Sequence, residues 1–312
     1  AGFLAKVTAP ELTKHGYDRS WGLGSIAAAG ALATLIPPSI MMVIFAMLTQ
    51  ISVGRILIAG IIPGFISIAL MIAMLEIVAR LKPELFPHVA MNITWKMRMS
   101  ATWQIFPILI VFLAIMLGIY TGIFTPTAAG AVGGAIVLLA ALMFYRISVR
   151  KIPEAMFSTA VINAQVFLVV LGGLLFSKVI ALSGLIGVLV SVITPLPEFA
   201  VVCGIVALFV VAGAMLDPVS MLVISVPFIF PIMSAMGFDP VQIGIMSTVM
   251  VEVAVVTPPV GFNCYVVASS ANVDSSVVFW GVIPYIVIML FVVALVLIFP
   301  QLSTYLPTLM LG

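Results

Sequence analysis

Two pairs of adjacent prolines interrupt apolar segments that are otherwise long enough to cross a lipid bilayer. Pro258-Pro259 lie in the apolar run from about 241 to 271, and Pro37-Pro38 lie in the run from about 21 to 48. Adjacent prolines remove two backbone donors and clash with the preceding turn, so neither run can form one continuous helix. In hydrocarbon, such a break is tolerated only where protein or a polar cavity satisfies the freed backbone groups. Each break therefore predicts a site built into a membrane protein.

The two breaks belong to an internal repeat. Pro37 and Pro258 are 221 residues apart, and the same offset relates the Gly-aromatic-Asp sequence at 16–18 to that at 237–239. Agreement of these different features at one offset is hard to obtain by chance. Two related halves with interrupted helices are typical of secondary transporters, which build their binding sites at such breaks.

The composition is that of a polytopic membrane protein. Of 312 residues, 64% are hydrophobic and 7% are charged, and the mean hydropathy is +1.39. Soluble domains carry roughly 25% charged residues. The net charge of +2 gives no indication of a nucleic-acid partner. Cys203 and Cys264 both lie in apolar runs, so a disulfide framework is not expected. We therefore predict an all-α fold that spans a membrane several times.

The apolar pattern predicts a series of helices joined by short loops. The segment 178–195 is too short and irregular for a further span, and residues 92–96 are compatible with a helix on the membrane surface. The expected elements are a broken helix over 21–48, spans at 56–77, 104–121, 128–145 and 154–177, a re-entrant hairpin over 199–236, a second broken helix over 240–271 and a last helix over 279–299.

The basic residues indicate the orientation of these elements. Nine of the twelve lysines and arginines fall in the loops 14–19, 80–98 and 146–151, which the predicted crossings place on one side of the membrane. By the positive-inside rule this side is cytoplasmic. The turns at 16–18 and 237–239 then face opposite sides, so the two repeats are predicted to be inverted.

With these features the sequence resembles the large membrane subunit (DctM-type) of TRAP transporters, the tripartite ATP-independent periplasmic carriers. The resemblance extends over essentially the whole chain. It rests on five motifs in the expected order: Leu35-Ile36-Pro37-Pro38-Ser39, Ala59-Gly60-Ile61-Ile62-Pro63-Gly64, Phe124-Thr125-Pro126-Thr127, Met215-Leu216-Asp217-Pro218 and Thr257-Pro258-Pro259-Val260-Gly261-Phe262-Asn263.

The resemblance implies an ion-transporter-type fold in which each inverted repeat carries one hairpin and one broken helix. It implies sodium-driven uptake of an organic acid anion, with an elevator-like transport domain moving against a scaffold. The implied partners are a small four-helix membrane subunit and a periplasmic substrate-binding protein, and the implied location is the bacterial inner membrane. Ala128 departs from the family, which commonly has Glu at that place, so no carboxylate role is assigned there.

The resemblance also divides the chain. Residues 1–48 and 199–271 would form the transport domain, 49–198 scaffold helices with connecting segments, and 272–312 a terminal scaffold helix and tail. The offset of 221 puts the first hairpin tip a few residues before Ala1. On this expectation the N-terminal part of the first repeat, on the order of a hundred residues, is missing from this sequence.

A sodium ion prefers several hard oxygen ligands, which unwound carbonyls supply without charge. We predict two sodium sites, with the substrate provisionally assigned to Ser39, Thr257 and Asn263. The first site comprises Gly30, Ala33, Thr34, Ile36, Pro37 and Ser39. The second comprises Gly213, Met215, Asp217, Ser220, Val255, Thr257, Gly261 and Asn263.

The prolines and the acidic residues also have simpler, purely structural interpretations. The prolines could serve only to shape the helices, and Asp217 could cap the helix that starts at Pro218 instead of binding an ion. Glu252 is a carboxylate within the membrane and thus a functional candidate. It could take part in ion or proton coupling, or bond to neighbouring backbone and stay neutral.

Other function classes fit less well. An intramembrane enzyme lacks a catalytic constellation, because Asp18 and Asp239 are separated by the whole membrane in the predicted topology. A channel is disfavoured by the paired hairpins and broken helices. The nearest alternative is a sodium/carboxylate symporter of the same superfamily that needs no binding protein. The substrate is left open among C4-dicarboxylates, sialic acid, other sugar acids and sulfonates.

Overall fold

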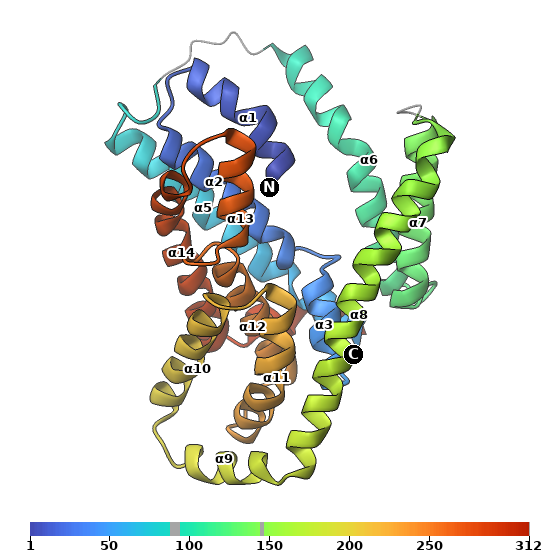
Figure 1. The fold of residues 1–312 in the computed structure, drawn as a ribbon, viewed down its shortest axis with the longest axis vertical. Coiled ribbons are helices and arrows are strands. Elements are labelled where there is room, and N and C mark those ends of the chain that lie inside the picture. The colour runs from blue at the N-terminus through green and yellow to red at the C-terminus, as the bar shows by residue number, and fades with distance from the viewer. Residues whose placement is uncertain (88–93, 144–146, 312) are drawn as a thin grey trace. The chain divides into compact units, whose positions relative to one another are not determined.

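The computed structural model describes residues 1–87, 94–143 and 147–311, and these form two compact units (Figure 1). The first unit comprises residues 1–87 and 169–310, and the second comprises 94–143 and 147–168. All regular elements of the described residues are helices, and no strand occurs among them. The predicted all-α fold is therefore confirmed.

The first unit contains both proline breaks and the predicted hairpin. Its helices are α1 (Gly2–Lys14), α2 (Arg19–Ala31), the 3-10 turn η1 (Leu32–Thr34), α3 (Ile40–Thr49), α4 (Val53–Ala59), α5 (Ile61–Leu81), the end of α8 (Ile152–Leu182), α9 (Leu185–Ile193), α10 (Glu198–Gly213), α11 (Pro218–Ala235), α12 (Pro240–Ala254), α13 (Phe262–Ala271), α14 (Ser275–Ile298) and α15 (Gln301–Leu311).

The second unit is a smaller set of helices. It contains α6 (Trp95–Tyr120), α7 (Pro126–Met143), the 3-10 turn η2 (Val149–Lys151) and the first part of α8. Helices α6 and α7 pack against each other, and a Cβ atom at Gly133 would lie only 2.5 Å from Ile115 Cδ1. The missing side chain thus allows this close approach of the two helices.

The internal repeat predicted from the sequence is visible in the order of the helices. Shifting residue numbers by 221 carries α1 onto the end of α11, α2 onto α12, α3 onto α13, and α4 with α5 onto α14. Both proline pairs contain a cis peptide bond, Pro37–Pro38 and Pro258–Pro259. The turns at Gly16 and Gly237 also match, because each glycine has a positive φ, of 73° and 93°.

Aspartates start the first half of each broken helix. The carboxylate of Asp18 accepts a hydrogen bond from Trp21 N at 3.0 Å, and that of Asp239 accepts one from Val241 N at 2.8 Å. Such caps satisfy backbone donors that have no partner within the helix. Each half then ends where the proline pair removes the next donors.

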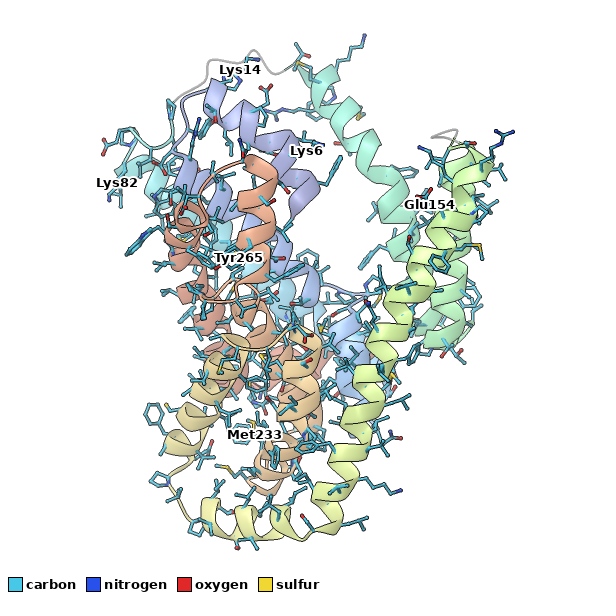
Figure 2. All side chains as sticks on the ribbon, viewed as in Figure 1. Lys6, Lys14, Lys82, Glu154, Met233 and Tyr265 are labelled. Atoms are coloured by element: carbon cyan, nitrogen blue, oxygen red, sulfur yellow. The ribbon has the colours of Figure 1, made fainter. Side chains whose placement is uncertain are left out.

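The two repeats interleave within the first unit. Helix α1 packs against α13 of the other repeat, and α11 packs against α3, so each hairpin arm contacts the second half of the opposite broken helix. Helix α14 packs against both α2 and α12. Figure 2 shows Lys14 and Lys82 toward one end of this unit and Met233, which precedes the turn at Gly237, toward the other. The two breaks are therefore held in one packed core.

Four segments show more detail in the structure than the sequence predicted. The predicted span over 56–77 lies within the apolar helical segment Val53–Leu81, in which α4 and α5 meet at Gly60, where an added Cβ atom would lie 2.7 Å from Leu35 O. Residues 95 and 96 begin the long helix α6 instead of lying in an interfacial helix, and residues 88–93 and 144–146 lie outside the described part of the chain.

The other two segments contain more helix than predicted. Helix α8 continues to Leu182. As the irregular pattern of 178–195 predicted, this segment is interrupted, at Gly184 with a φ of 73°, and only the short helix α9 follows. The predicted tail contains α15, because Pro300 has no N–H to extend α14 while its carbonyl accepts a bond from Thr304 N at 3.0 Å.

Five helical segments of the described residues are long and apolar enough to cross a membrane, judged by length and composition. They are Val53–Leu81, Pro126–Met143, Val149–Leu182, Pro218–Ala235 and Ser275–Ile298. The separation into transport and scaffold domains concerns movement and stays a prediction.

Candidate functional site

The first break is a short non-helical segment between α2 and α3. Because Pro37 and Pro38 have no N–H, the carbonyls of Ala33 and Thr34 lose their usual helical donors. The Ser39 hydroxyl donates to the Thr34 carbonyl and also accepts a hydrogen bond from Met42 N at 3.4 Å. Ser39 is buried and thus connects the break to the start of α3.

The second break satisfies its backbone differently. Val255 is the counterpart of Thr34 in the repeat, and its carbonyl accepts a hydrogen bond from Asn263 N at 2.9 Å. The Ala254 carbonyl accepts one from Thr257 N at 3.2 Å. The Thr257 hydroxyl donates to Val253 O at 2.6 Å and keeps its oxygen lone pairs available.

Gly261 allows the backbone of the second break to adopt a positive φ and to pass close to α14. Its φ of 29° lies in the region that favours glycine, and an added Cβ atom would lie 2.4 Å from Cε1 of Phe279 on α14. That ring packs edge-on against Tyr265, with ring centroids 5.3 Å apart. Gly261 is therefore required by both the backbone conformation and the space available.

The second break contacts the first half of the other broken helix. The Asn263 side chain donates to the carbonyl of Ala27 on α2 at 3.4 Å. An added Cβ atom at Gly30 would lie 3.2 Å from Asn263 Nδ2 and 2.7 Å from Ala1 Cβ. Predicted residues of both sites, Gly30 and Asn263, thus lie side by side although they are far apart in the sequence.

The hairpin tip reaches the second break at one residue. An added Cβ atom at Gly213 would lie 2.3 Å from Ala254 Cβ, so the end of α10 touches the last residue of α12. Met215 is 75% exposed, and Ser220 lines a largely apolar cavity with Gly173 and Phe176 of α8. The structure therefore brings Gly213 to the break and places the Met215 and Ser220 side chains elsewhere.

Asp217 acts as a helix cap in this structure. Its Oδ1 accepts hydrogen bonds from Val219 N at 3.0 Å and Ser220 N at 3.1 Å, and Pro218 follows at the first helical position. This arrangement is the usual start of a helix. Of the two interpretations of Asp217, the geometry supports capping.

The remaining predicted residues lie along the two non-helical segments. In the first break Pro37 is buried, Thr34 and Ile36 are half-buried, and Ala33 is exposed. In the second break Thr257 and Asn263 are half-buried while Pro258 and Pro259 are exposed. Both segments therefore combine a buried anchor with carbonyl and hydroxyl oxygens near the surface of the unit.

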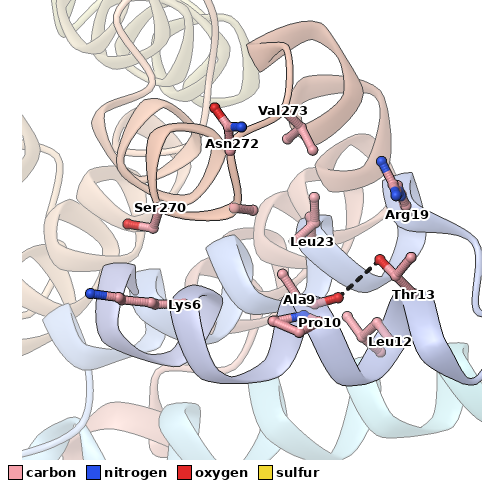
Figure 3. Close-up of a pocket in the computed structure, with 11 residues that line it drawn as sticks. Lys6, Ala9, Pro10, Leu12, Thr13, Arg19, Leu23, Ser270, Asn272 and Val273 are labelled. Carbon is pink, nitrogen blue, oxygen red and sulfur yellow. Dashed lines mark hydrogen bonds between the residues drawn. The ribbon is translucent and has the colours of Figure 1, made fainter.

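A separate cavity of about 480 Å³, lined by both polar and apolar residues, lies between α1, the start of α2 and the end of α13 (Figure 3). Lys6 and Arg19 line it together with Ser270 and Asn272. The Thr13 hydroxyl at its edge is already bonded to Ala9 O at 3.0 Å. The cavity contains none of the predicted sodium ligands, so it is distinct from both breaks.

The two breaks offer neutral oxygen donors. Among the described residues no group of three or more His, Cys, Asp or Glu side chains could hold a metal ion. Carbonyl and hydroxyl oxygens are the kind of ligand that a hard cation such as an alkali metal ion prefers.

Sequence patterns gave no signal for three parts of the site. The Ala27 carbonyl bonds to Asn263, the Ala254 methyl contacts Gly213, and the Phe279 ring covers Gly261. Each is an ordinary apolar residue or a backbone group, and its role depends on tertiary packing between repeats.

Comparison with known proteins shows that the sequence matches one protein family over almost its whole length. Residues 3–302 match the family model described as "Tripartite ATP-independent periplasmic transporter, DctM component".

Three similar proteins are all named as large permeases of TRAP transporters. A C4-dicarboxylate TRAP transporter large permease of Pseudomonas aeruginosa is 31% identical over 302 residues, covering 95% of this chain and 69% of that protein. A sialic acid TRAP transporter large permease of Vibrio cholerae is 29% identical over 316 residues, covering 100% and 73%. An ectoine TRAP transporter large permease of Halomonas elongata is 31% identical over 305 residues, covering 95% and 70%.

Proposed function

Because the chain belongs to the DctM family of TRAP transporter large permeases, multi-pass proteins of the bacterial inner membrane, we propose that it catalyses sodium-coupled uptake of an organic acid anion. A periplasmic binding protein delivers this anion, and a small four-helix membrane subunit completes the permease. The family is one of transporters and not of enzymes.

The observation that carries the proposal is the pairing of two broken helices in one unit. The second break meets α2 through the contact from Asn263 to Ala27, and Gly30 lies beside it. Broken helices that meet within the membrane provide the ion and substrate sites of many secondary transporters. The proposed sodium ligands are the carbonyl and hydroxyl oxygens of the two breaks. Thr34 and Thr257 would supply the hydroxyl oxygens.

The substrate class rests on the relatives. Their names refer to C4-dicarboxylates, sialic acid and ectoine, which all carry a carboxylate group. Asn263 can donate a hydrogen bond to such an oxygen, and the Ser39 and Thr257 hydroxyls can do so if they leave their present carbonyl partners. These three side chains are therefore the proposed contacts to the acid group.

Electrostatics accounts for the need for a coupling cation. Moving an anion inward against an inside-negative potential costs about 2.3 kcal/mol per charge at 100 mV. The sequence contains no nucleotide-binding loop, so a co-transported cation has to supply this work. Two sodium ions, one at each break, would offset the charge of a dianion. In the proposed elevator movement both breaks travel together, because α1 packs against α13 and α11 packs against α3.

Uptake into proteoliposomes tests the proposal. The full-length permease is reconstituted with its small subunit and a loaded binding protein, and a panel of carboxylates and sulfonates is supplied with an inward sodium gradient. We expect uptake of at least one acid that stops when potassium replaces sodium and when the binding protein is omitted. Equal uptake with potassium would contradict sodium coupling. Full uptake without the binding protein would instead favour a symporter that works alone.

A further inference from the structure

Glu252 is an unsatisfied carboxyl group in the interior of the first unit. It lies in the last turn of α12, its exposed fraction is 0%, and neither of its oxygens has a hydrogen-bond partner among the described residues. Other polar side chains of the same helix are satisfied. Ser247 donates to Ile243 O and Thr248 donates to Gly244 O, both at 2.8 Å. The situation of Glu252 is therefore specific to this side chain.

No positive charge compensates Glu252. The main elements packed against α12 are α2, η1, α3, α4, α10, α11 and α14. Within the described parts of the chain, none of the titratable groups on these elements or at their caps forms an ion pair or hydrogen bond with Glu252. These groups are Asp18, Arg19, Arg55, Glu198, Cys203, Asp217, Asp274 and Tyr285.

The arginine on α4 is far from Glu252 along the helix. Arg55 lines a cavity with Asp239 and Pro240 at the start of α12. Glu252 lies twelve residues further along, about 18 Å at 1.5 Å per residue. Asp239 is itself an acid and caps α12. Arg55 is therefore too far away to neutralise Glu252.

Tyr285 of α14 lies at the same level as Glu252. Gln242 Nε2 donates to Val296 O and Leu297 O at 3.0 Å, and α14 ends at Ile298, so the rest of α12 runs back along α14. Glu252 lies ten residues after Gln242 on α12, and Tyr285 lies eleven residues before Val296 on α14. The two residues are therefore at about the same height along the paired helices. The Tyr285 hydroxyl is buried and lies beside Ser25 of α2.

The carboxyl group belongs to the second repeat alone. The residue 221 positions before Glu252 is Ala31, which is also fully buried. A carboxyl group at this place is therefore no requirement of the shared fold. Its presence next to the second break, fully buried and without a hydrogen-bond partner among the described residues, indicates a ligand-binding role.

We infer that Glu252 is a proton-binding site. An ionised carboxylate here would lose its hydration without gaining any partner, whereas a neutral carboxylic acid avoids that cost. A sodium ion would need several oxygen ligands, and the nearby hydroxyls of Ser247 and Thr248 are bonded within their helix. In the proposed step, one carboxylate oxygen forms an O–H bond with a proton taken from water. The proton returns to water when the second broken helix moves and exposes Glu252.

Infrared spectroscopy and thermal unfolding of the full-length protein in detergent test the site directly. Near neutral pH, we expect the carbonyl band of a protonated carboxylic acid, which Glu252→Gln removes and the exposed control Glu198→Gln retains. Since the folded state keeps a proton that the unfolded chain releases above about pH 4.3, the unfolding temperature should fall with rising pH. In Glu252→Gln, the part of this pH-dependent decrease in unfolding temperature that comes from Glu252 should be absent. A band and a pH profile that are both unchanged in Glu252→Gln would overturn the inference.

Uptake measurements separate this inference from sodium coupling. This arm rests on the proposed function, whereas the infrared and unfolding measurements do not. We expect Glu252→Gln to keep its sodium requirement and to lose part of the pH dependence of uptake. A stable variant whose sodium requirement disappears would show that Glu252 binds sodium and would overturn the proton assignment. Sodium-independent uptake by the wild type would refute the proposed function but leave the infrared result to decide the proton site.

Discussion

In the first break the Thr34 carbonyl accepts a hydrogen bond from the Ser39 side chain, whereas in the second break the matching Val255 carbonyl accepts one from the backbone of Asn263. Both breaks satisfy a carbonyl that a proline leaves without its helical donor. The first does so with a side chain, and the second does so by folding the following backbone over it. The two related segments therefore depend on different kinds of residue.

Two further positions extend this difference. Gly261 of the second break corresponds to Ile40 of the first, and the acidic Glu252 corresponds to Ala31. The second break thus needs a glycine and carries a buried acid, while the first needs neither. The comparison indicates that the repeats have kept a common backbone plan and have diverged in what each break can bind.

The largest effect is expected from Gly261→Ala. Its positive φ costs an alanine about 1–2 kcal/mol, and the new methyl group would collide with the Phe279 ring for about 1–3 kcal/mol more. We expect a loss of about 3 kcal/mol in the free energy of unfolding and loss of uptake. Thermal unfolding of the purified protein gives the stability, and the proteoliposome assay gives the activity.

Gly237→Ala is the matched control for this variant. Gly237 has a φ of 93°, but an added Cβ atom would meet no atom within 4 Å. The free energy of unfolding of Gly237→Ala should therefore decrease only by the cost of the positive φ, about 1–2 kcal/mol. If both variants lost the same stability, the Phe279 contact would not matter and the second break would be no more constrained than an ordinary turn.

Thr257→Val is expected to act on sodium binding more than on folding. The substitution keeps the shape of the side chain and removes a hydroxyl that donates to Val253 O. Loss of one oxygen ligand to a cation, about 1.5–3 kcal/mol, should raise the sodium concentration for half-maximal uptake by about tenfold or more. Uptake measured against sodium concentration checks this.

Thr34→Val makes the corresponding change in the first break, where the hydroxyl donates to Ala31 O at 2.9 Å. If each break binds one sodium ion, both single variants should raise the sodium requirement. An unchanged requirement in well-folded Thr257→Val, with a raised one in Thr34→Val, would confine sodium to the first break.

The positions of the breaks follow from the sequence because their cause is local. Pro37 and Pro258 remove donors wherever they occur in a helix, and the runs around them are long enough to show the interruption. Asp217 could likewise be interpreted as a cap from its place before Pro218, although the sequence left ion binding as an equal alternative. The structure shows it accepting two backbone N–H groups.

The contacts between repeats could not be predicted in the same way. Asn263 and Ala27 are 236 residues apart, and nothing in the apolar sequence around Ala27 marks its carbonyl as an acceptor. Ser220 lies close to the hairpin tip in sequence, yet the turn of α11 directs it toward α8. The partner of each side chain depends on how whole helices cross, and periodicity alone does not determine that.

Ser39→Ala tests the use of a side chain in the first break. The Ser39 hydroxyl satisfies the Thr34 carbonyl and accepts from Met42 N, so its removal should cost about 1–2 kcal/mol of stability. Asn263→Ala is the comparison in the second break. It removes a long bond of 3.4 Å and leaves the backbone bond to Val255 O, so about 0.5 kcal/mol is expected. Equal losses in unfolding measurements would contradict the proposed difference between the breaks.

The smallest effect concerns the helix caps that follow the two breaks. Asp274 caps α14 by accepting a hydrogen bond from Ser276 N at 2.8 Å, whereas Ser52 caps α4 by accepting one from Arg55 N at 3.4 Å. Hydrogen bonds from the side chain and the backbone N–H of Ser276 lower the pKa of Asp274.

Because its pKa is lower in the folded state, Asp274 should contribute stability above about pH 3.9, the unfolded value, and lose that contribution as pH falls through the folded pKa. Asp274→Asn keeps a good capping residue without the charge, so stability near neutral pH should change little while this acid-dependent component disappears. Ser52→Ala should lower stability by a similar amount at every pH, since no charge is removed. Unfolding temperatures measured from about pH 3 to 7 distinguish the two caps. A pH-independent loss in Asp274→Asn would mean that the charge of Asp274 does not contribute, and the caps behind the two breaks would then be equivalent.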